Sequence, residues 1–194
     1  MRRYSHQIVN ALTFYRILAA PILLLLIISH RPEVFKWLLA ISFFTDAIDG
    51  YLARRYKVNS VLGARLDSIG DDLTVAVGVI GIIAFKPEFL HQQIFLFILM
   101  LVLFIFQTSL AFIKYGRMSS FHTYAAKVSA ILQGLFLVLF FFFDKPLELM
   151  FYIAAGVTII DLLEEIILVI LLHEWRTDVK GLYWVMREPD SERK

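Results

Sequence analysis

Cysteine is absent from this sequence of 194 residues, and charged residues make up only 19% of it. The lack of cysteine excludes disulfide bonds, zinc sites built from thiolates and cysteine nucleophiles. The chain also carries little net charge, only +2 at pH 7. Such a weak field gives no indication of a nucleic-acid partner, and we expect none.

Apolar residues, by contrast, make up 59% of the chain, and the mean hydropathy is +0.72. A soluble domain usually has about 45–50% apolar and about 25% charged residues, so this chain has too little polar surface to cover a globule in water. Its apolar runs are continuous, whereas the strands of an outer-membrane barrel alternate lipid-facing and lumen-facing residues. The composition predicts an all-α integral membrane protein that crosses the bilayer several times.

Six apolar segments are long enough to cross a hydrocarbon core about 30 Å thick, which takes roughly 20 helical residues. The predicted transmembrane helices cover approximately residues 11–29, 35–55, 63–85, 92–114, 125–143 and 147–172. The two arginines before the first segment resemble the start of a signal peptide, but no small-residue cleavage pattern follows, so a first membrane span is predicted. The connections are short and polar without a convincing internal repeat, which predicts one membrane domain over residues 1–194.

The basic residues predict which side of the membrane each connection faces. With the N-terminus inside, 15 Lys and Arg residues lie at cytoplasmic ends and loops and 4 outside, a strong bias under the positive-inside rule. Both termini are therefore expected in the cytoplasm, on an inner or cell membrane. The tail 173–194 mixes aromatic and charged residues, which suits either a helix in the headgroup layer or a loosely ordered segment.

Five aspartates interrupt the second and third predicted spans, where a charge near the bilayer centre costs about 2.5–3.5 kcal/mol. They are Asp46, Asp49, Asp67, Asp71 and Asp72. The first two are three residues apart and the next two are four apart, so each pair lies on one face of its helix. A short connection makes the two helices antiparallel neighbours, so four carboxylates can converge. They either bind two divalent cations, which suit carboxylate oxygens, or pair with the arginines nearby.

The stretch from Asp46 to Asp71 resembles the signature of the CDP-alcohol phosphatidyltransferase family, which reads D-x2-D-G-x2-A-R-x8-G-x3-D-x3-D. All its fixed positions occur at the required spacings. They are Asp46, Asp49, Gly50, Ala53, Arg54, Gly63, Asp67 and Asp71. The signature also lies across the second and third of six predicted membrane helices, as it does in the family.

The resemblance implies six membrane helices around an active site open to the cytoplasm. It implies that the four aspartates hold two Mg²⁺ or Mn²⁺ ions, with Asp46 and Asp67 on both ions, Asp49 on the first and Asp71 on the second. Asp71 is also implied as the general base, which takes the proton from an alcohol acceptor. The acceptor hydroxyl then attacks the β-phosphorus of CDP-diacylglycerol and expels CMP, a step of phospholipid biosynthesis. A homodimer is a further expectation from the resemblance.

Several substrate contacts are implied by the same signature. Gly50 lets the nucleotide approach the helix backbone, or else permits close helix packing. Arg54 can hold a phosphate with two hydrogen bonds, and Gly63 completes the pattern between the two aspartate pairs. Ser60 lies six residues after Arg54. In some family members the residue at this position contacts the CDP-lipid, although a loop serine is more often only solvated.

The segment before the first span resembles a second family element, N-x-L-T-x2-R-x4-P. Its first four positions are Asn10, Ala11, Leu12 and Thr13, followed by Arg16 and Pro21. In the family this segment lies against the nucleotide, and helix N-terminal amides favour anionic groups. Asn10 or Thr13 could also simply cap a helix. The element looks most like that of the phosphatidylglycerophosphate synthases, which use glycerol 3-phosphate.

Two departures from those synthases concern the acceptor alcohol. The synthases usually carry G-K-x-K-T at the start of the fifth span. At residues 126–130 this sequence has Ala-Lys-Val-Ser-Ala, so only the first lysine of the motif, Lys127, is kept. Beside the fourth aspartate, Asp72 stands where the family often has lysine. Both changes remove positive charge near a site for anionic substrates. Glycerol 3-phosphate remains the predicted acceptor, and phosphatidylglycerol, serine, inositol and inositol phosphate remain alternatives.

Two further charged groups are a basic cluster at the same predicted membrane face as the aspartates and a set of acids inside the sixth predicted span. The basic cluster consists of Lys114, Arg117, His122 and Lys127. We assign Lys127 to an acceptor phosphate. For the others we favour anchoring to anionic lipids, which is worth about 1 kcal/mol per charge. Asp161, Glu164 and Glu165 share one side of the sixth predicted span. They pair with Arg65 or Lys127, contact a second subunit, or select a cationic acceptor, and the sequence leaves these open.

Two other functions compete with a phosphatidyltransferase. The intramembrane acids could line a cation or proton transporter, but the aspartates cluster at one membrane end and the sequence shows no paired broken helices at midplane. The chain could also be a catalytically silent family member. The intact aspartate set argues against loss of activity without proving turnover.

Overall fold

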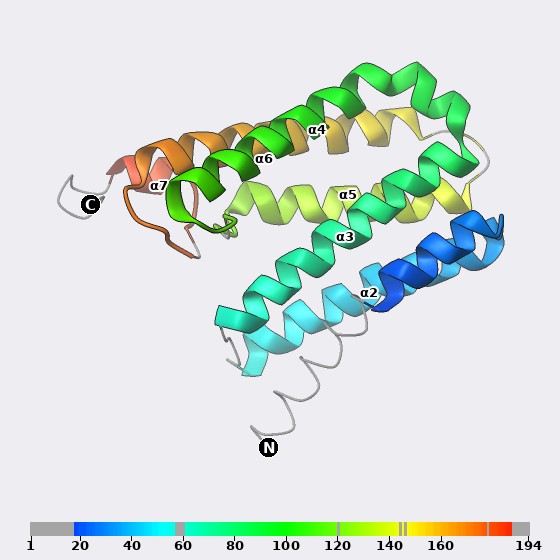
Figure 1. The fold of residues 1–194 in the computed structure, drawn as a ribbon, viewed down its shortest axis with the longest axis horizontal. Helices are drawn as coiled ribbons and strands as arrows, with labels where there is room; N and C mark the ends of the chain where they lie inside the picture. The colour runs from blue at the N-terminus through cyan, green and yellow to red at the C-terminus, as the bar shows by residue number, and fades with distance from the viewer. Residues whose placement is uncertain are drawn as a thin grey trace. The chain divides into compact units, whose positions relative to one another are not determined.

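The regular structure is helical. The computed structural model describes residues 18–56, 61–119, 121–143, 145, 147–177 and 179–187, without the side chains of residues 46, 47, 49–56 and 61–69. Its helices are Leu18–Ile28, α2 (Pro32–Tyr56), α3 (Val61–Phe85), α4 (Pro87–Tyr115), α5 (Tyr124–Phe142), α6 (Glu148–Leu171) and α7 (Leu182–Arg187) (Figure 1). The predicted all-α class is therefore confirmed. The helix Leu18–Ile28 and helices α2 to α6 fall on the six predicted apolar segments, whereas the short helix α7 lies in the tail, outside them.

Two helices begin at prolines that lie outside the predicted spans. Pro32 is the first residue of α2 and Pro87 is the first residue of α4. Proline suits this place, because the first N–H groups of a helix have no intrahelical partner and the ring fixes a helical φ. Glu33 and Glu88 follow in the first turns, where a carboxylate interacts favourably with the helix dipole.

The chain divides into two compact units. Unit 1 comprises residues Met1–Leu90 and Leu137–Pro146, and unit 2 comprises His91–Phe136 and Leu147–Lys194. Helices α4 and α5 contribute to both units, because each passes from one to the other. One domain over residues 1–194 stays a prediction.

Unit 1 is held together by aromatic rings packed against glycine. The ring of Phe35 is fully buried and lies edge-on to Phe85 and Phe141, with centroid distances of 5.4 and 5.1 Å. Gly81 of α3 makes this possible, since a Cβ at that position would be 2.5 Å from Cζ of Phe35. Gly78, one turn earlier, is in similar contact with Leu137. These close approaches fix α3 against its neighbours.

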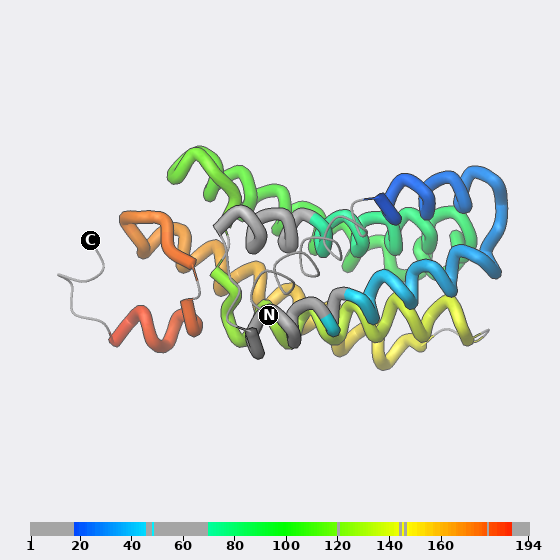
Figure 2. Tube along the Cα trace, turned by 90° about the horizontal axis from the view of Figure 1, so that it is seen from below, coloured from blue at the N-terminus to red at the C-terminus, as the bar shows by residue number. Residues whose placement is uncertain are grey.

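Unit 2 has a core of its own at the end where α4 and α6 finish. That core consists of Ala111, Phe121, Leu168, Val169, Leu172, Val179 and Val185. Helix α7 packs on α6, and Figure 2 shows it folded back beside the end of that helix. The tail after α6 therefore contributes buried side chains to the core as far as Val185.

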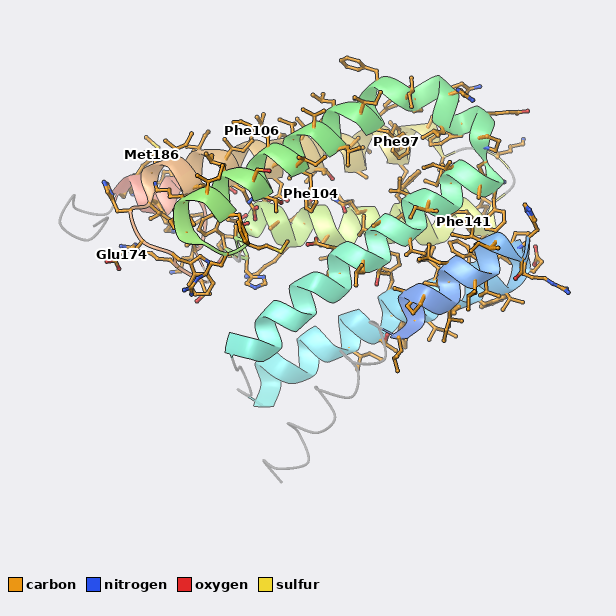
Figure 3. The ribbon with its side chains drawn as sticks, viewed as in Figure 1. Phe97, Phe104, Phe106, Phe141, Glu174 and Met186 are labelled. Carbon is orange, nitrogen blue, oxygen red and sulfur yellow. The ribbon has the colours of Figure 1, made fainter. Side chains whose placement is uncertain are left out.

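Two helices are long and apolar enough to cross a membrane within the described part of the chain, α4 and α5. Their most apolar stretches are only 11% and 28% buried within the protein. A core helix of a soluble protein would bury most of such a stretch, so these exposed apolar faces are suited to lipid. Figure 3 shows side chains such as Phe104 and Phe106 along α4. Six transmembrane helices stay a prediction.

Candidate active site

The four aspartates of the signature lie on the hairpin formed by α2 and α3, two helices that pack against each other (Figure 1). Asp46 is as far along the chain from the end of α2 as Asp71 is from the start of α3. Asp49 and Asp67 likewise stand at nearly equal distances from these two ends. Because both helices rise about 1.5 Å per residue, the backbone brings the four positions to neighbouring levels of the hairpin.

Only part of the predicted site is described at the level of side chains. Asp71 is half-buried, and its neighbour Asp72 is exposed. The remaining predicted ligands and contacts lie outside the described side chains. These are Asn10, Ala11, Leu12, Thr13, Asp46, Asp49, Gly50, Arg54, Ser60, Gly63 and Asp67. Their roles stay predictions.

The donor set on the hairpin is chemically suited to divalent cations. Among the described side chains, no group of three or more His, Cys, Asp or Glu residues could hold a metal ion. The signature aspartates, however, include three whose side chains are not described, and whose backbone positions lie at neighbouring levels of the α2–α3 hairpin. Carboxylates supply the hard oxygen ligands that Mg²⁺ and Mn²⁺ prefer, so a divalent-cation site on this hairpin stays a prediction.

Lys127 lies in the first turn of α5, a turn that Thr123 caps. The Thr123 hydroxyl oxygen accepts a hydrogen bond from the Ala126 N–H at 3.0 Å, and its carbonyl accepts one from the Lys127 N–H at 3.1 Å. Threonine is a common helix cap because its hydroxyl satisfies an N–H that has no partner within the helix. The Lys127 ammonium is exposed and lies 5.4 Å from the centroid of the Tyr124 ring. Thr123 and Tyr124 were not among the residues predicted from the sequence.

Two other members of the basic cluster have structural partners. The Lys114 ammonium donates to the carbonyls of Val169 and Ile170, at 2.8 and 3.0 Å. It therefore satisfies carbonyls in the last turn of α6, where a positive charge also complements the helix dipole. The Arg117 guanidinium lies 4.9 Å from the ring centroid of Trp175. These contacts agree with a supporting role for both residues.

Two acids of α6 accept hydrogen bonds within unit 2, whereas Oδ1 of Asp161 and Oε2 of Glu164 are buried with no hydrogen-bond partner among the described residues. Oε1 of Glu164 accepts from the Leu182 N–H at 2.8 Å, and Oε2 of Glu165 accepts from the Ser119 hydroxyl at 3.2 Å. Asp161 neighbours Ser129 in α5. The sequence left open whether these acids pair with Arg65 or Lys127, contact a second subunit or select a cationic acceptor. It gave no indication that a backbone N–H in the tail or a loop hydroxyl would reach them.

Comparisons with known proteins agree with the signature. Residues 6–171 match the model of the CDP-alcohol phosphatidyltransferase family. A Pseudomonas fluorescens protein named CDP-diacylglycerol–glycerol-3-phosphate 3-phosphatidyltransferase is 39% identical over 79 residues, which cover 38% of this chain and 40% of that protein. No solved structure matches the chain.

Two relatives with other names match a similar share of the chain. A Schizosaccharomyces pombe fusion protein of a CMP-forming cardiolipin synthase and a mitochondrial hydrolase is 34% identical over 71 residues, covering 37% of this chain and 12% of that protein. A Saccharomyces cerevisiae CDP-diacylglycerol–inositol 3-phosphatidyltransferase is 36% identical over 67 residues, covering 34% of this chain and 30% of that protein. The matches thus span less than half the length of these curated relatives.

Proposed function

Because this chain belongs to the CDP-alcohol phosphatidyltransferase family, we propose that it transfers a phosphatidyl group from CDP-diacylglycerol to glycerol 3-phosphate and releases CMP. The complete set of signature residues from Asp46 to Asp71 carries the proposal. The backbone of the α2–α3 hairpin supports it, because it brings the four aspartate positions to neighbouring levels. The transporter alternative has no comparable support from the family match.

Glycerol 3-phosphate is the proposed acceptor for two reasons. The Pseudomonas fluorescens relative carries that acceptor in its name, and the segment from Asn10 to Thr13 resembles the corresponding element of such enzymes. Lys127 then binds the acceptor phosphate, because its ammonium lies in the first turn of a helix, where the N–H groups also favour an anion. Other alcohols remain alternatives, because the Schizosaccharomyces pombe and Saccharomyces cerevisiae relatives are named for cardiolipin synthesis and for transfer to inositol.

The proposed chemistry assigns each step to a residue of this chain. Asp46, Asp49, Asp67 and Asp71 would hold two Mg²⁺ or Mn²⁺ ions, which neutralise the diphosphate and favour departure of its phosphate. Asp71 accepts the proton of the acceptor hydroxyl, whose oxygen forms the new bond to the β-phosphorus. The bond from that phosphorus to the bridging oxygen breaks, and CMP leaves with the electron pair. Arg54 holds a phosphate of the nucleotide-lipid.

The proposal also includes the membrane arrangement. The six apolar segments predict six spanning helices, and the 15 to 4 distribution of basic residues predicts that both termini lie in the cytoplasm. Helix α7 lies in the headgroup layer, since Tyr183, Trp184 and Met186 are exposed beside Arg187, whose guanidinium lies 4.5 Å from the Tyr183 ring. Figure 3 labels Met186 on this helix. A homodimer rests on the family resemblance alone.

Release of CMP from CDP-diacylglycerol by the purified full chain tests the function. The assay uses Mg²⁺ or Mn²⁺, an EDTA control, and an acceptor panel of glycerol 3-phosphate, serine, inositol, inositol phosphate and phosphatidylglycerol. We expect metal-dependent release with glycerol 3-phosphate. Release with another alcohol alone would replace the acceptor, whereas release in EDTA would contradict the two-ion site. Folded protein that binds CDP-diacylglycerol without releasing CMP would indicate a silent family member.

A further inference from the structure

The tail that follows α6 is bonded to the segment that leads into α5. The Val179 N–H donates to the Phe121 carbonyl at 2.7 Å, and the Tyr124 N–H donates to the Lys180 carbonyl at 3.2 Å. These bonds lie immediately before the turn that carries Lys127. The side chains of Phe121, Val179 and Val185 are buried in one cluster, so the contact excludes water as well.

Glu164 fixes the start of α7 in this arrangement. Its Oε1 accepts the Leu182 N–H at 2.8 Å, and it would lie 3.0 Å from a Cβ placed on Gly181. Gly181 has a φ of 147°, a conformation that other residues rarely adopt. The chain therefore turns at Gly181 against the carboxylate and enters α7 directly afterwards. A charged acceptor on an N–H in a partly buried place is among the stronger hydrogen bonds in proteins.

Aromatic contacts connect α7 to Lys127. The Trp184 ring lies 5.4 Å from the Tyr124 ring, and the Lys127 ammonium lies 5.4 Å from that same Tyr124 ring. A cation over an aromatic ring is attracted by the electrons of the ring face. Tyr124 thus contacts both α7 and the lysine. Displacing α7 would remove the Trp184 ring from Tyr124. The Lys127 ammonium could then adopt a wider range of positions.

We propose that Glu164 is a positioning residue for acceptor binding, which acts by holding the tail 172–187 against the first turn of α5 and thereby placing Lys127. This inference rests on the proposed function, because it takes Lys127 as the ligand of the acceptor phosphate. It also gives a role to one of the three α6 acids, which the signature does not include. Glu164 itself touches no substrate in this proposal.

The test compares Michaelis constants of full-length variants for glycerol 3-phosphate and for CDP-diacylglycerol. We expect Glu164→Ala to raise the KM for glycerol 3-phosphate by about three- to tenfold, the range expected for losing one ordinary hydrogen bond, with little change in the KM for CDP-diacylglycerol. Glu164→Gln keeps an oxygen that accepts the Leu182 N–H and should restore most of the loss. Equal rises in both constants, or no rise at all, would overturn the inference.

A double-mutant cycle shows whether Glu164 acts through Lys127. In a Lys127→Ala background, Glu164→Ala should raise the acceptor KM no further, because the group it positions is already gone. If Lys127→Ala alone leaves that KM unchanged, the assignment of Lys127 is wrong and the inference falls with it. If Lys127→Ala raises the KM but Glu164→Ala does not, only the inference fails.

A second pair of variants covers the case in which Glu164→Ala does not fold. The Tyr115 hydroxyl donates to the carbonyls of Val169 and Leu172, at 3.1 and 2.7 Å, and so holds the start of the tail. Tyr115→Phe removes these bonds and should raise the acceptor KM and speed tryptic cleavage in the tail. Tyr152→Phe, which only removes an exposed bond with Gln93, is the matched control and should do neither. Identical behaviour of the two variants would contradict the proposed role of the tail.

Discussion

Two groups of carboxylates in this chain have the same spacing but belong to different sequence patterns. Asp67 and Asp71 on α3 are four residues apart, and Asp161 and Glu165 on α6 are also four apart, each within an apolar helix. On α6 the described acids meet hydrogen-bond donors of the protein, such as the Leu182 N–H and the Ser119 hydroxyl. On the α2–α3 hairpin the acids belong to an eight-residue signature that crosses two helices.

Helical spacing alone therefore does not distinguish a metal-binding carboxylate from one that has a structural role. A carboxylate in an apolar helix has to be compensated, and either cations or protein donors can do so. For α6 the donors come from the loop after α4 and from the tail, both distant in sequence. For the hairpin the compensating group is proposed to be a pair of metal ions. Substitutions on the two helices should therefore have different consequences.

The largest difference is expected for Asp71→Asn. The amide keeps the size of the side chain but cannot accept the proton, so CMP release should fall about 100-fold or more. The melting temperature in detergent should stay close to that of the parent protein. Near-normal CMP release would show that Asp71 is not the general base.

Lys127→Ala is expected to have the next largest effect on catalysis. Losing one charge-assisted hydrogen bond should raise the KM for glycerol 3-phosphate about tenfold, while the KM for CDP-diacylglycerol changes little. Lys127→Arg retains the charge and serves as the control. An unchanged acceptor KM for the alanine variant would leave Lys127 as a membrane anchor only.

Gly81→Ala tests the packing that supports the hairpin. The new methyl group would lie 2.5 Å from Cζ of Phe35 and 3.0 Å from Cζ of Phe141, so the rings must move. We expect a loss of about 1–3 kcal/mol in the free energy of unfolding, measured by denaturation in detergent. Gly156→Ala in α6, where no atom lies within 4 Å of the added carbon, is the matched control and should be neutral or slightly stabilising. Equal effects of the two would contradict the close packing of α3.

Glu165→Gln is expected to have the smallest effect. The amide oxygen can still accept the hydrogen bond from Ser119, so the free energy of unfolding should change by less than about 1 kcal/mol and CMP release should be nearly unchanged. The two variants Asp71→Asn and Glu165→Gln remove one negative charge each, which makes them a direct comparison of the two helices. A large loss of CMP release in the second would place Glu165 in the active site.

Much of this protein was predictable because its signals are local or periodic. Long apolar runs predict helices wherever the backbone must satisfy its own hydrogen bonds, and all described helices except α7 lie on the predicted segments. The signature from Asp46 to Asp71 predicted the family, since its residues are fixed in spacing along one hairpin. The boundaries were less predictable, because Pro32 and Pro87 suit either a connection or the first turn of a helix.

The sequence by itself determined the helical class, the apolar segments and the family, since each depends on residues close together in the chain. Only the tertiary structure decided the partners of Glu164, Glu165 and Lys114, because the donors and carbonyls they meet lie far away in sequence. The course of the described tail residues, 172–177 and 179–187, was decided in the same way. Its short helix α7 could not be stable alone, and it is held by buried Val179 and Val185 and by the carboxylate of Glu164.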